Sequence, residues 1–465
     1  MNSIEIFKRF LARANLDVKQ HQLEGVEWMV EKELYPEDKE NIGGICADEM
    51  GLGKTIQMLG LIVSNLKPNT LIVVPVNLLS QWEHQIEKNF GFKPLVYYGN
   101  AKKEIDNDLL KLAPITLTTY GQLCSDLCDL FDLKWSRVIY DEAHHMKNKN
   151  TKLYAIQSKL IRTYTWLVTG TPVQNKLTDL KNLFNLIGLK DIRKKYEAYI
   201  DSYILKRTKQ ECNVVLPKVT TKIINVPFEH DIESLTYAEK NISKELHSSL
   251  SFMNINLEDD PKLISNYLQT LDRLPLLIQC RQMCIMPKML QNKLQSTKDI
   301  CSFNDDYYMF SEAVESSSKL NKMCQDIEKN KNGRSKLIFC SYRMEIDYLY
   351  KSTLMMGYNV EKIDGRTTSV QRKNILANSY DILILQISTC SEGINLQKYS
   401  EIYIASPSWN PATEDQAIGR CHRIGQTQEV FVYKYFMETF DTDGKDKTLD
   451  NHIDDIQKFK RDIYI

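Results

Sequence analysis

The chain has 465 residues, of which 43% are hydrophobic, and its 60 Lys and Arg residues balance 60 Asp and Glu residues, so the formal net charge is zero. This length is too great for one ordinary hydrophobic core and predicts two domains with accessory elements. Zero net charge excludes a wholly basic, histone-like nucleic-acid binder. No apolar run reaches membrane-spanning length and the N-terminal segment is mixed and charged, so we expect a protein that is neither secreted nor inserted in a membrane.

Eleven cysteines are scattered along the chain, and the two close pairs are Cys124/Cys128 and Cys280/Cys284. Neither pair has the Cys-x-x-Cys spacing of a zinc knuckle. We therefore expect buried free thiols in a reducing compartment, with a zinc site as the weaker alternative.

Short β-branched runs alternate with longer amphipathic stretches, which is the pattern of parallel α/β sheets. The expected buried strands are Thr70–Val74, Ile115–Thr119, Arg137–Tyr140 and Thr165–Val168 in the first half, and Lys336–Cys340, Asp381–Ile387, Glu401–Ile404 and Val430–Tyr433 in the second. Between the two series the sequence is helical and charged. The predicted segments are a first α/β lobe over residues 1–225, a helical linker or protrusion over 226–318, a second α/β lobe over 319–440, and a charged tail or brace helix over 441–465.

The first candidate site is the Gly-containing segment Ala47–Thr55, which lies between two apolar runs and predicts strand, loop and helix. A helix N-terminus preceded by such a loop presents backbone N–H groups to phosphate oxygens. Lys54 would add positive charge at the phosphates, and the Thr55 hydroxyl would hold Mg²⁺. Asp48 stands where the generic phosphate-loop pattern has Gly.

The second candidate is the acidic run Asp141-Glu142-Ala143-His144, directly after an expected strand. Ligands bind at the carboxyl ends of strands in open α/β sheets. Asp141 would hold Mg²⁺, and Glu142 would orient the attacking water. The alternative is an acidic loop that caps the next helix, which the upstream phosphate loop disfavours. Thr169–Pro172 follows another expected strand. This segment is a candidate for coupling the state of the bound nucleotide to the position of the lobes.

The third candidate is Gln416–Gln426 in the second half, where Arg420 and Arg423 are three residues apart. On a helix these two arginines would share a face. Guanidinium groups suit phosphate oxygens and stabilise charge in phosphoryl transfer. The alternative is an exposed, salt-bridged helix.

In this order, the segments resemble the superfamily 2 helicase-like ATPases, specifically the SWI/SNF-type double-stranded DNA translocases, from about Lys19 to Tyr435. Asp48 is that family's own residue in the phosphate loop. Further segments that carry the resemblance are Gln22–Trp28, Val74-Pro75 with Ser80–Trp82, Thr118–Tyr120, Leu205–Lys209 with Leu216-Pro217, Arg281–Cys284 and Trp409–Pro411.

The resemblance implies two RecA-like lobes, each a mostly parallel sheet flanked by helices, with ATP and Mg²⁺ as cofactors. The catalytic residues that it implies are Lys54, Asp141, Glu142, Gln416, Arg420 and Arg423. The implied nucleotide-binding residues are Gln22, Asp48, Gly51, Gly53, Lys54, Thr55 and Gly393, with Thr55 and Asp141 on Mg²⁺. The implied DNA-binding residues are Trp82, Thr118, Thr119 and Asn395.

One segment departs from the family pattern. Cys390 and Ser391 replace two glycines where backbone approaches phosphate, and Glu392 adds negative charge, whereas Gly393 and Asn395 match. We therefore expect this segment to bind DNA weakly.

The sequence predicts a monomeric motor that hydrolyses ATP, moves along double-stranded DNA and remodels protein–DNA complexes or DNA structures, with RNA polymerase or other DNA-bound proteins as candidate partners. Two alternatives stay open: a strand-separating DNA or RNA helicase, and a non-catalytic DNA-binding or polymerase-bridging protein with a dead motor. Because no histone-reading, zinc-binding or nuclear-targeting module is visible outside the motor segments, we expect an origin in a large DNA virus or a prokaryote. The expected location is a viral cytoplasmic replication site, with the nucleus as the alternative.

Overall fold

The computed structural model describes residues 2–36, 43–125, 129–146, 148–157, 159–170, 177–189, 196–230, 233–251, 274–290, 317–390 and 395–464. The chain divides into two compact units, Met1–Val215 and Leu216–Ile465. Each unit is built around its own parallel sheet, and each is described by itself below.

The first unit contains a seven-stranded sheet with the order β3-β4-β2-β5-β6-β1-β7, and the recorded strand pairs are parallel. Its strands are β1 (Gly43–Cys46), β2 (Thr70–Val74), β3 (Leu95–Val96), β4 (Ile115–Thr119), β5 (Lys134–Asp141), β6 (Ile161–Val168) and β7 (Ile204–Leu205). The four strands expected from this half of the sequence correspond to β2, β4, β5 and β6.

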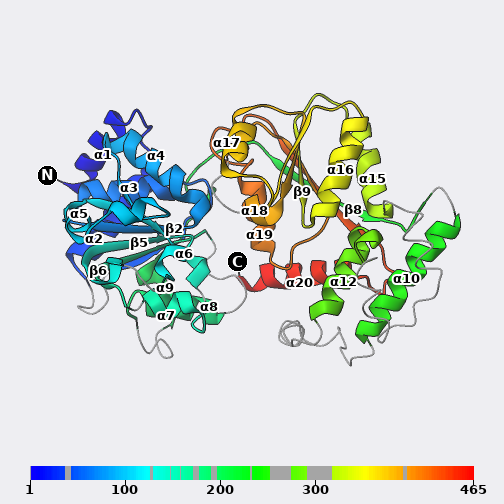
Figure 1. The fold of residues 1–465 in the computed structure, drawn as a ribbon, viewed down its shortest axis with the longest axis horizontal. Coiled ribbons are helices and arrows are strands. Elements are labelled where there is room, and N and C mark those ends of the chain that lie inside the picture. Colours follow the sequence, from blue (N-terminus) through cyan, green and yellow to red (C-terminus); the bar gives the residue numbers. More distant parts are fainter. Residues whose placement is uncertain are drawn as a thin grey trace. The chain divides into compact units, whose positions relative to one another are not determined.

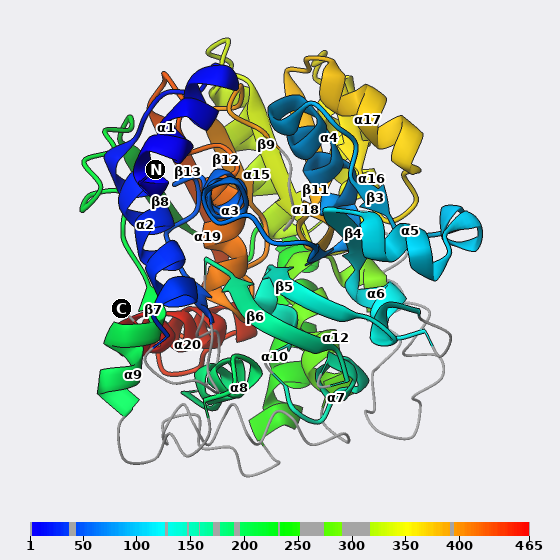
Figure 2. The ribbon, with the colours of Figure 1, turned by 90° about the vertical axis from the view of Figure 1, so that its left-hand side faces the viewer.

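Helices cover both faces of this sheet. They are α1 (Ser3–Arg13), α2 (Gln20–Leu34), α3 (Lys54–Ser64), α4 (Leu79–Phe90), α5 (Asn107–Leu112), α6 (Tyr120–Leu123), α7 (Lys152–Gln157), α8 (Leu177–Leu186) and α9 (Tyr196–Tyr203). Successive residues of a strand point to opposite faces. Ile72 therefore packs with the core under α1 to α4, whereas Leu71 packs with the core over α7 and α8. Figure 2 shows α3 on one side of β5 and β6, and α7 and α8 on the other.

The second unit contains a six-stranded parallel sheet with the order β10-β11-β9-β12-β13-β8. Its strands are β8 (Val219–Val226), β9 (Lys336–Cys340), β10 (Val360–Ile363), β11 (Ile382–Gln386), β12 (Glu401–Ile404) and β13 (Val430–Met437). The four expected strands correspond to β9, β11, β12 and β13. Because β8 pairs with β13 over its whole length, the unit begins earlier than the predicted end of the first lobe at residue 225.

Helices also cover both faces of the second sheet, as Figure 1 shows. They are α10 (Glu233–Ser251), α12 (Leu274–Ile285), α15 (Ser318–Lys329), α16 (Arg343–Met355), α17 (Ser369–Ala377), α18 (Ile387–Cys390), α19 (Pro411–Gly419) and α20 (Leu449–Tyr464). The core on one face is formed with α10, α12, α15, α16 and α20, and the core on the other face with α17 and α19. The described part of the expected helical region is thus packed onto the second sheet.

The end of the chain is a helix that braces the second unit. Lys319 of α15 forms a fully buried ion pair with Asp450 of α20. Gln457 of α20 donates a hydrogen bond to Oε1 of Glu414 on α19 at 2.7 Å. Within residues 441–465, expected to be a charged tail or a brace helix, the structure has α20 from Leu449 to Tyr464.

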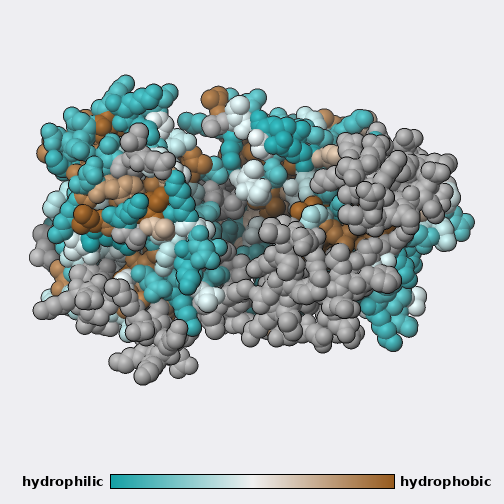
Figure 3. All heavy atoms as spheres, turned by 60° about the horizontal axis from the view of Figure 1, so that its bottom comes forward, coloured by the Kyte–Doolittle hydropathy of each residue, from teal (hydrophilic) through white to brown (hydrophobic). Residues whose placement is uncertain are grey.

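On the face drawn in Figure 3 the coloured surface is mostly hydrophilic, with small hydrophobic groups. Within the described ranges, no helix combines the length and the apolar character needed to cross a bilayer. The described cysteines are free thiols, and the same ranges contain no cluster of three or more His, Cys, Asp and Glu side chains suited to a metal ion.

Candidate nucleotide site

Strand register brings three of the expected motifs to one edge of the first sheet. Cys46 at the end of β1 is in register with Val168 of β6, which is in register with Asp141 at the end of β5. The loop after β1, the residues after β6 and the acidic run after β5 therefore emerge side by side. In open α/β sheets this carboxyl edge is where ligands bind.

The segment after β1 forms the expected loop and helix. Gly51 has φ +93° and Gly53 has φ +81°, left-handed values that favour glycine, and α3 begins at the next residue, Lys54. The Lys54 ammonium group donates to the main-chain oxygen of Asp48 at 2.7 Å. Thr55 follows in the first turn of α3. The N-terminal N–H groups of α3 and the Lys54 charge are thus held at the same edge of the sheet.

Gln22 lies against this loop. The side chains of Gln22 and His21, both buried on α2, contact the main-chain oxygen of Leu52 at 3.1 and 2.9 Å. A Cβ atom at Gly53 would lie 2.3 Å from Nε2 of Gln22. Glycine at this position therefore allows α2 to approach the loop closely.

Asp48 is held inside the protein by Gln57 and Arg207. Its carboxylate, fully buried, accepts hydrogen bonds from Gln57 at 2.9 Å and from Arg207 at 2.6 and 3.0 Å. Arg207 lies in Leu205–Lys209, a segment that carries the family resemblance. Nothing in the sequence indicated that its partner is Asp48.

Asp141 is held by two aromatic side chains. Its Oδ2 atom accepts the indole N–H of Trp82 at 2.7 Å, and its main-chain oxygen accepts the hydroxyl of Tyr120 at 2.6 Å. Burial and the neighbouring charge of Glu142 raise the pKa of Asp141 to about 6, while the Trp82 hydrogen bond and the Lys54 charge act in the opposite direction.

Glu142 and the end of β6 complete the group in the first unit. Glu142 has φ +51°, a left-handed value uncommon outside glycine, and Nδ1 of His144 lies 3.4 Å from its Oε2 atom. The same Nδ1 atom is 3.4 Å from the Thr169 hydroxyl. A Cβ atom at Gly170 would be 3.5 Å from Nζ of Lys54. The relay residues after Gly170 lie outside the described residues.

The residues expected to touch DNA in the first unit are buried. Trp82, Thr118 and Thr119 are exposed by 1%, 0% and 2%. The Thr118 hydroxyl donates to the main-chain oxygen of Tyr97 at 3.0 Å, and Thr119 caps α6 by accepting the N–H of Gln122. The Trp82 indole supports Asp141 in this structure, and its contact with DNA stays a prediction.

In the second unit, Gln416 lies on α19, but the two arginines do not. The helix ends at Gly419, with Arg420 as its C-cap and Arg423 in the turns that follow. The expected shared helical face is therefore wrong. Burial and the charge of Arg420 lower the pKa of Arg423, so the two guanidinium groups are still close enough to repel each other.

The segment that departs from the family pattern is partly described. Gly393, together with Ser391 and Glu392, lies outside the described residues. Asn395 is exposed, and its side chain donates to Oε1 of Gln397 at 3.1 Å. The adjacent Leu396 N–H donates to the main-chain oxygen of Arg420 at 3.1 Å, so this segment lies against the arginine turn.

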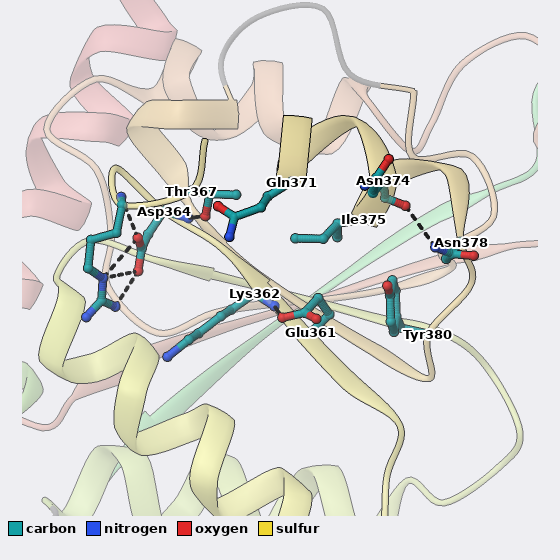
Figure 4. Close-up of a pocket in the computed structure, with 10 residues that line it drawn as sticks. Glu361, Lys362, Asp364, Thr367, Gln371, Asn374, Ile375, Asn378 and Tyr380 are labelled. Atoms are coloured by element: carbon teal, nitrogen blue, oxygen red, sulfur yellow. Dashed lines mark hydrogen bonds and ion pairs between the residues drawn. The ribbon is translucent and has the colours of Figure 1, made fainter. Parts of the chain in front are cut away.

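A separate pocket of about 450 Å³ opens in the second unit, between β10, α17 and the residues after α17. Figure 4 shows the lining side chains that come from these elements. Arg366 in this lining forms ion pairs with Asp364 and Asp347. None of the described residues assigned to nucleotide or DNA is among its lining residues.

Comparison with known families agrees with this geometry. A family model described as the SNF2-related domain matches residues 21–196, and a model described as the helicase conserved C-terminal domain matches residues 318–425. The chain therefore contains an SNF2-related domain and a helicase C-terminal domain. The SNF2-related match lies within the first unit, which holds the phosphate loop and the acidic run.

This SNF2-related chain is similar to curated proteins of different sizes. It is 26% identical over 451 residues to a "Probable global transactivator" of Orgyia pseudotsugata multicapsid polyhedrosis virus, covering 90% of this chain and 86% of that protein. It is 25% identical over 510 residues to the "DNA excision repair protein ERCC-6-like" of Danio rerio, covering 89% of this chain. The chain spans only 34% of that repair protein.

Among solved structures, the chain is similar to the "Sulfolobus solfataricus SWI2/SNF2 ATPase core in complex with dsDNA". The sequence identity is 23% and the TM-score is 0.41, with 96% of this chain and 92% of that chain covered.

Proposed function

We propose that this protein is a DNA-dependent ATPase that moves along double-stranded DNA and remodels protein–DNA complexes or DNA structures. The observation that carries the proposal is the gathering of Lys54, Asp141 and Glu142 at the carboxyl edge of one parallel sheet, in a chain that contains an SNF2-related domain. These groups supply a positive charge for phosphate oxygens, a carboxylate suited to Mg²⁺ and a second carboxylate that can orient water.

The residues of the first unit have separate roles in the proposed hydrolysis. The N–H groups at the start of α3 and the Lys54 ammonium group bind phosphate oxygens. Gln22, held against the loop, contacts the base. Glu142 orients the attacking water, and the family resemblance assigns Arg420, Arg423 and Gln416 of the second unit to the same reaction.

The donors in this edge fit Mg²⁺, because the Thr55 hydroxyl and the Asp141 carboxylate are the oxygen ligands that this cation prefers. Each Asp141 oxygen accepts one hydrogen bond, from Trp82 or from the Glu142 N–H, and keeps a second lone pair. The bound cation would neutralise charge on the phosphates.

The double-stranded DNA substrate is proposed from the family and from its curated relatives. One relative is named as a DNA excision repair protein, and a viral relative is named as a probable global transactivator. The viral relative also supports a viral origin and a place of action at sites of viral replication or in the nucleus. RNA polymerase and other DNA-bound proteins are the proposed partners, and we propose a monomeric motor.

The decisive experiment measures ATP hydrolysis with no nucleic acid, single-stranded DNA, duplex DNA and RNA in parallel. Stimulation that is greatest with duplex DNA is the expected result. An absence of turnover under every condition would instead favour a non-catalytic protein with a dead motor.

Movement without strand separation is tested separately. Displacement of a third strand from a DNA triplex, with a forked duplex left intact, is expected of a duplex translocase. Unwinding of the fork without triplex displacement would show that the protein is a strand-separating helicase.

A further inference from the structure

Arg207 contacts the phosphate loop, although it belongs to a different part of the chain. Its Nε atom donates to Oδ1 of Asp48 at 3.0 Å, and its Nη2 atom donates to Oδ2 at 2.6 Å. This is a two-point guanidinium–carboxylate pair, the geometry that gives arginine its specificity for carboxylates. Asp48 is the residue that replaces the generic glycine of the loop.

The same guanidinium reaches the two helices on either side of the loop. Its Nη1 atom donates to the main-chain oxygen of His21 on α2 at 2.6 Å. Its Nη2 atom also lies 3.3 Å from Oε1 of Gln57 on α3. Arg207 thus joins the start of the loop, the helix that follows the loop, and the helix that carries Gln22.

Main-chain contacts hold this part of the chain to the loop as well. The N–H of Glu49 donates to the main-chain oxygen of Arg207 at 2.9 Å. The N–H of Lys209 donates to Oε2 of Glu49 at 2.8 Å, and Nζ of Lys209 lies 2.9 Å from Oε1. The segment after β7 therefore runs along the loop as a support.

Glycine on α2 makes room for this arrangement. A Cβ atom at Gly25 would lie 2.0 Å from Oε1 of Gln57 and 2.9 Å from Nη2 of Arg207. The first of these distances is too short for any real side chain, so Gln57 would have to move. Gly25 therefore allows the side chains around Asp48 to pack directly against the helix.

Because Asp48 is buried, the loss of its pair with Arg207 would disturb the phosphate loop. Asp48 is fully buried, and the Arg207 side chain is 15% exposed. A buried carboxylate that loses its partner must find another donor or reach water. Asp48 lies within the loop itself, so the loop would have to rearrange.

We propose that Arg207 is a positioning residue for ATP binding, which fixes the phosphate loop and the Gln22 helix in one arrangement before the nucleotide arrives. This inference rests on the proposed ATPase function. Because Arg207 contacts the loop through Asp48 rather than the nucleotide, its loss would weaken ATP binding more than it would slow the hydrolysis of bound ATP.

The test compares Arg207→Ala and Arg207→Lys with Arg162→Ala in the full chain. Arg162 is a matched control, because it is a half-buried arginine at the amino end of β6 that donates to the main-chain oxygens of Gln157 and Leu186. The dissociation constant of Mg·ATP, kcat, KM and the rise in Tm on adding Mg·ATP are measured for each.

For Arg207→Ala we expect the dissociation constant and KM to rise about tenfold or more, with kcat changed by less than about threefold. Arg207→Lys, which keeps the charge but loses the two-point contact, should lie between this variant and the wild type. Arg162→Ala should lower Tm, while its ATP affinity and its ATP-induced rise in Tm stay at wild-type values.

The inference is overturned if folded Arg207→Ala binds Mg·ATP as the wild type does, if Arg162→Ala weakens binding equally, or if kcat alone falls. If Arg207→Ala does not fold, Arg207→Lys and Gly25→Ala decide in its place, since Gly25→Ala displaces Gln57 and Arg207 without removing a charge. Wild-type protein that neither binds nor hydrolyses ATP would refute the proposed function itself, which is a distinct result.

Discussion

The indole N–H of Trp82 donates to Oδ2 of Asp141 at 2.7 Å inside the first unit. Trp82 lies on α4, and Asp141 ends β5, so this bond fixes one oxygen of the carboxylate proposed to hold the metal. A bond from a neutral donor to a carboxylate leaves the negative charge in place while fixing its direction. We therefore expect the tryptophan to act on the proposed reaction through this carboxylate.

Replacement of Trp82 by Phe should lower kcat about tenfold and change KM little. The ring volume is largely kept, but a hydrogen bond to a charged group is lost, and such bonds contribute about 1.5–3 kcal/mol. Steady-state ATPase measurements with saturating duplex DNA provide the readout. Trp135→Phe is the matched control, since Trp135 is equally buried and donates to the main-chain oxygen of Leu130. Equal losses in the two variants would refute the role of Trp82.

Replacement of Lys54 by Ala should abolish ATP turnover while the fold is kept. Lys54 is half-buried and donates to the main-chain oxygen of Asp48, so its removal costs little packing but takes away the positive charge at the phosphates. ATPase assays and thermal unfolding are measured together. Lys67→Ala, which removes a cation over the Tyr164 ring in the same unit, should keep its activity. Normal turnover by the Lys54 variant would disprove the assignment of the phosphate loop.

Glu33→Gln should destabilise the first unit by about 3–5 kcal/mol, because it leaves the Arg137 guanidinium buried without its carboxylate. Arg137 is fully buried and donates to Glu33 through Nε at 2.6 Å and Nη2 at 2.5 Å. Denaturant unfolding followed by Trp fluorescence reports on this unit, since four of the five Trp residues lie in it.

An exposed ion pair in the same unit provides the control for that measurement. Glu5 and Lys8 on α1 form a 3.3 Å contact with both side chains largely in solvent. Glu5→Gln should change stability by less than about 0.5 kcal/mol. A similar small change for Glu33→Gln would show that the buried pair contributes nothing measurable.

The second unit should lose stability as the pH falls from the ordinary pKa of histidine to the lower pKa of His452 in the folded protein. Burial, with the neighbouring charges of His247 and Lys447, lowers the pKa of His452 to about 4 from its ordinary value of 6.5. Between these values the unfolded chain binds a proton that the folded chain does not, so folding stability is present above pH 6.5 and is lost as the pH drops toward 4. The loss amounts to about 1–3 kcal/mol.

This pH dependence is measured as the difference in unfolding free energy between wild type and His452→Gln from pH 7.5 to about pH 4. Glutamine does not titrate, so the difference should shrink or reverse in sign as the pH falls. A difference that stays constant across the range would show that the pKa of His452 is the same in the folded and unfolded chains.

The phosphate loop was predictable because its features are local. Gly51 and Gly53 supply left-handed turns directly before a helix, and the apolar runs on each side form a buried strand and helix. The central strands were predictable for a related reason: a parallel strand buried on both faces is a continuous apolar run. Thr70–Val74 shows this pattern, with every residue buried.

Elements that lie at the edge of a sheet or the end of a helix were less predictable. Val219–Val226 forms β8 at the edge of the second sheet and is largely exposed, so its sequence lacks the apolar run of a buried strand. The predicted first lobe, residues 1–225, therefore included all but the last residue of this strand. Arg420 and Arg423 fit a helical spacing, but α19 ends at Gly419, and spacing alone does not locate a helix end.

The sequence by itself predicted the two parallel sheets, the family resemblance and the sheet edge at which we propose that a nucleotide binds, because motif order and hydrophobic runs are local properties of the chain. The tertiary structure alone decided which side chains support that edge. Trp82 meets Asp141 across 59 positions, and Arg207 meets Asp48 across 159. Such pairs depend on how the strands order themselves in the sheet and on which helices pack beside them, and no local pattern records either.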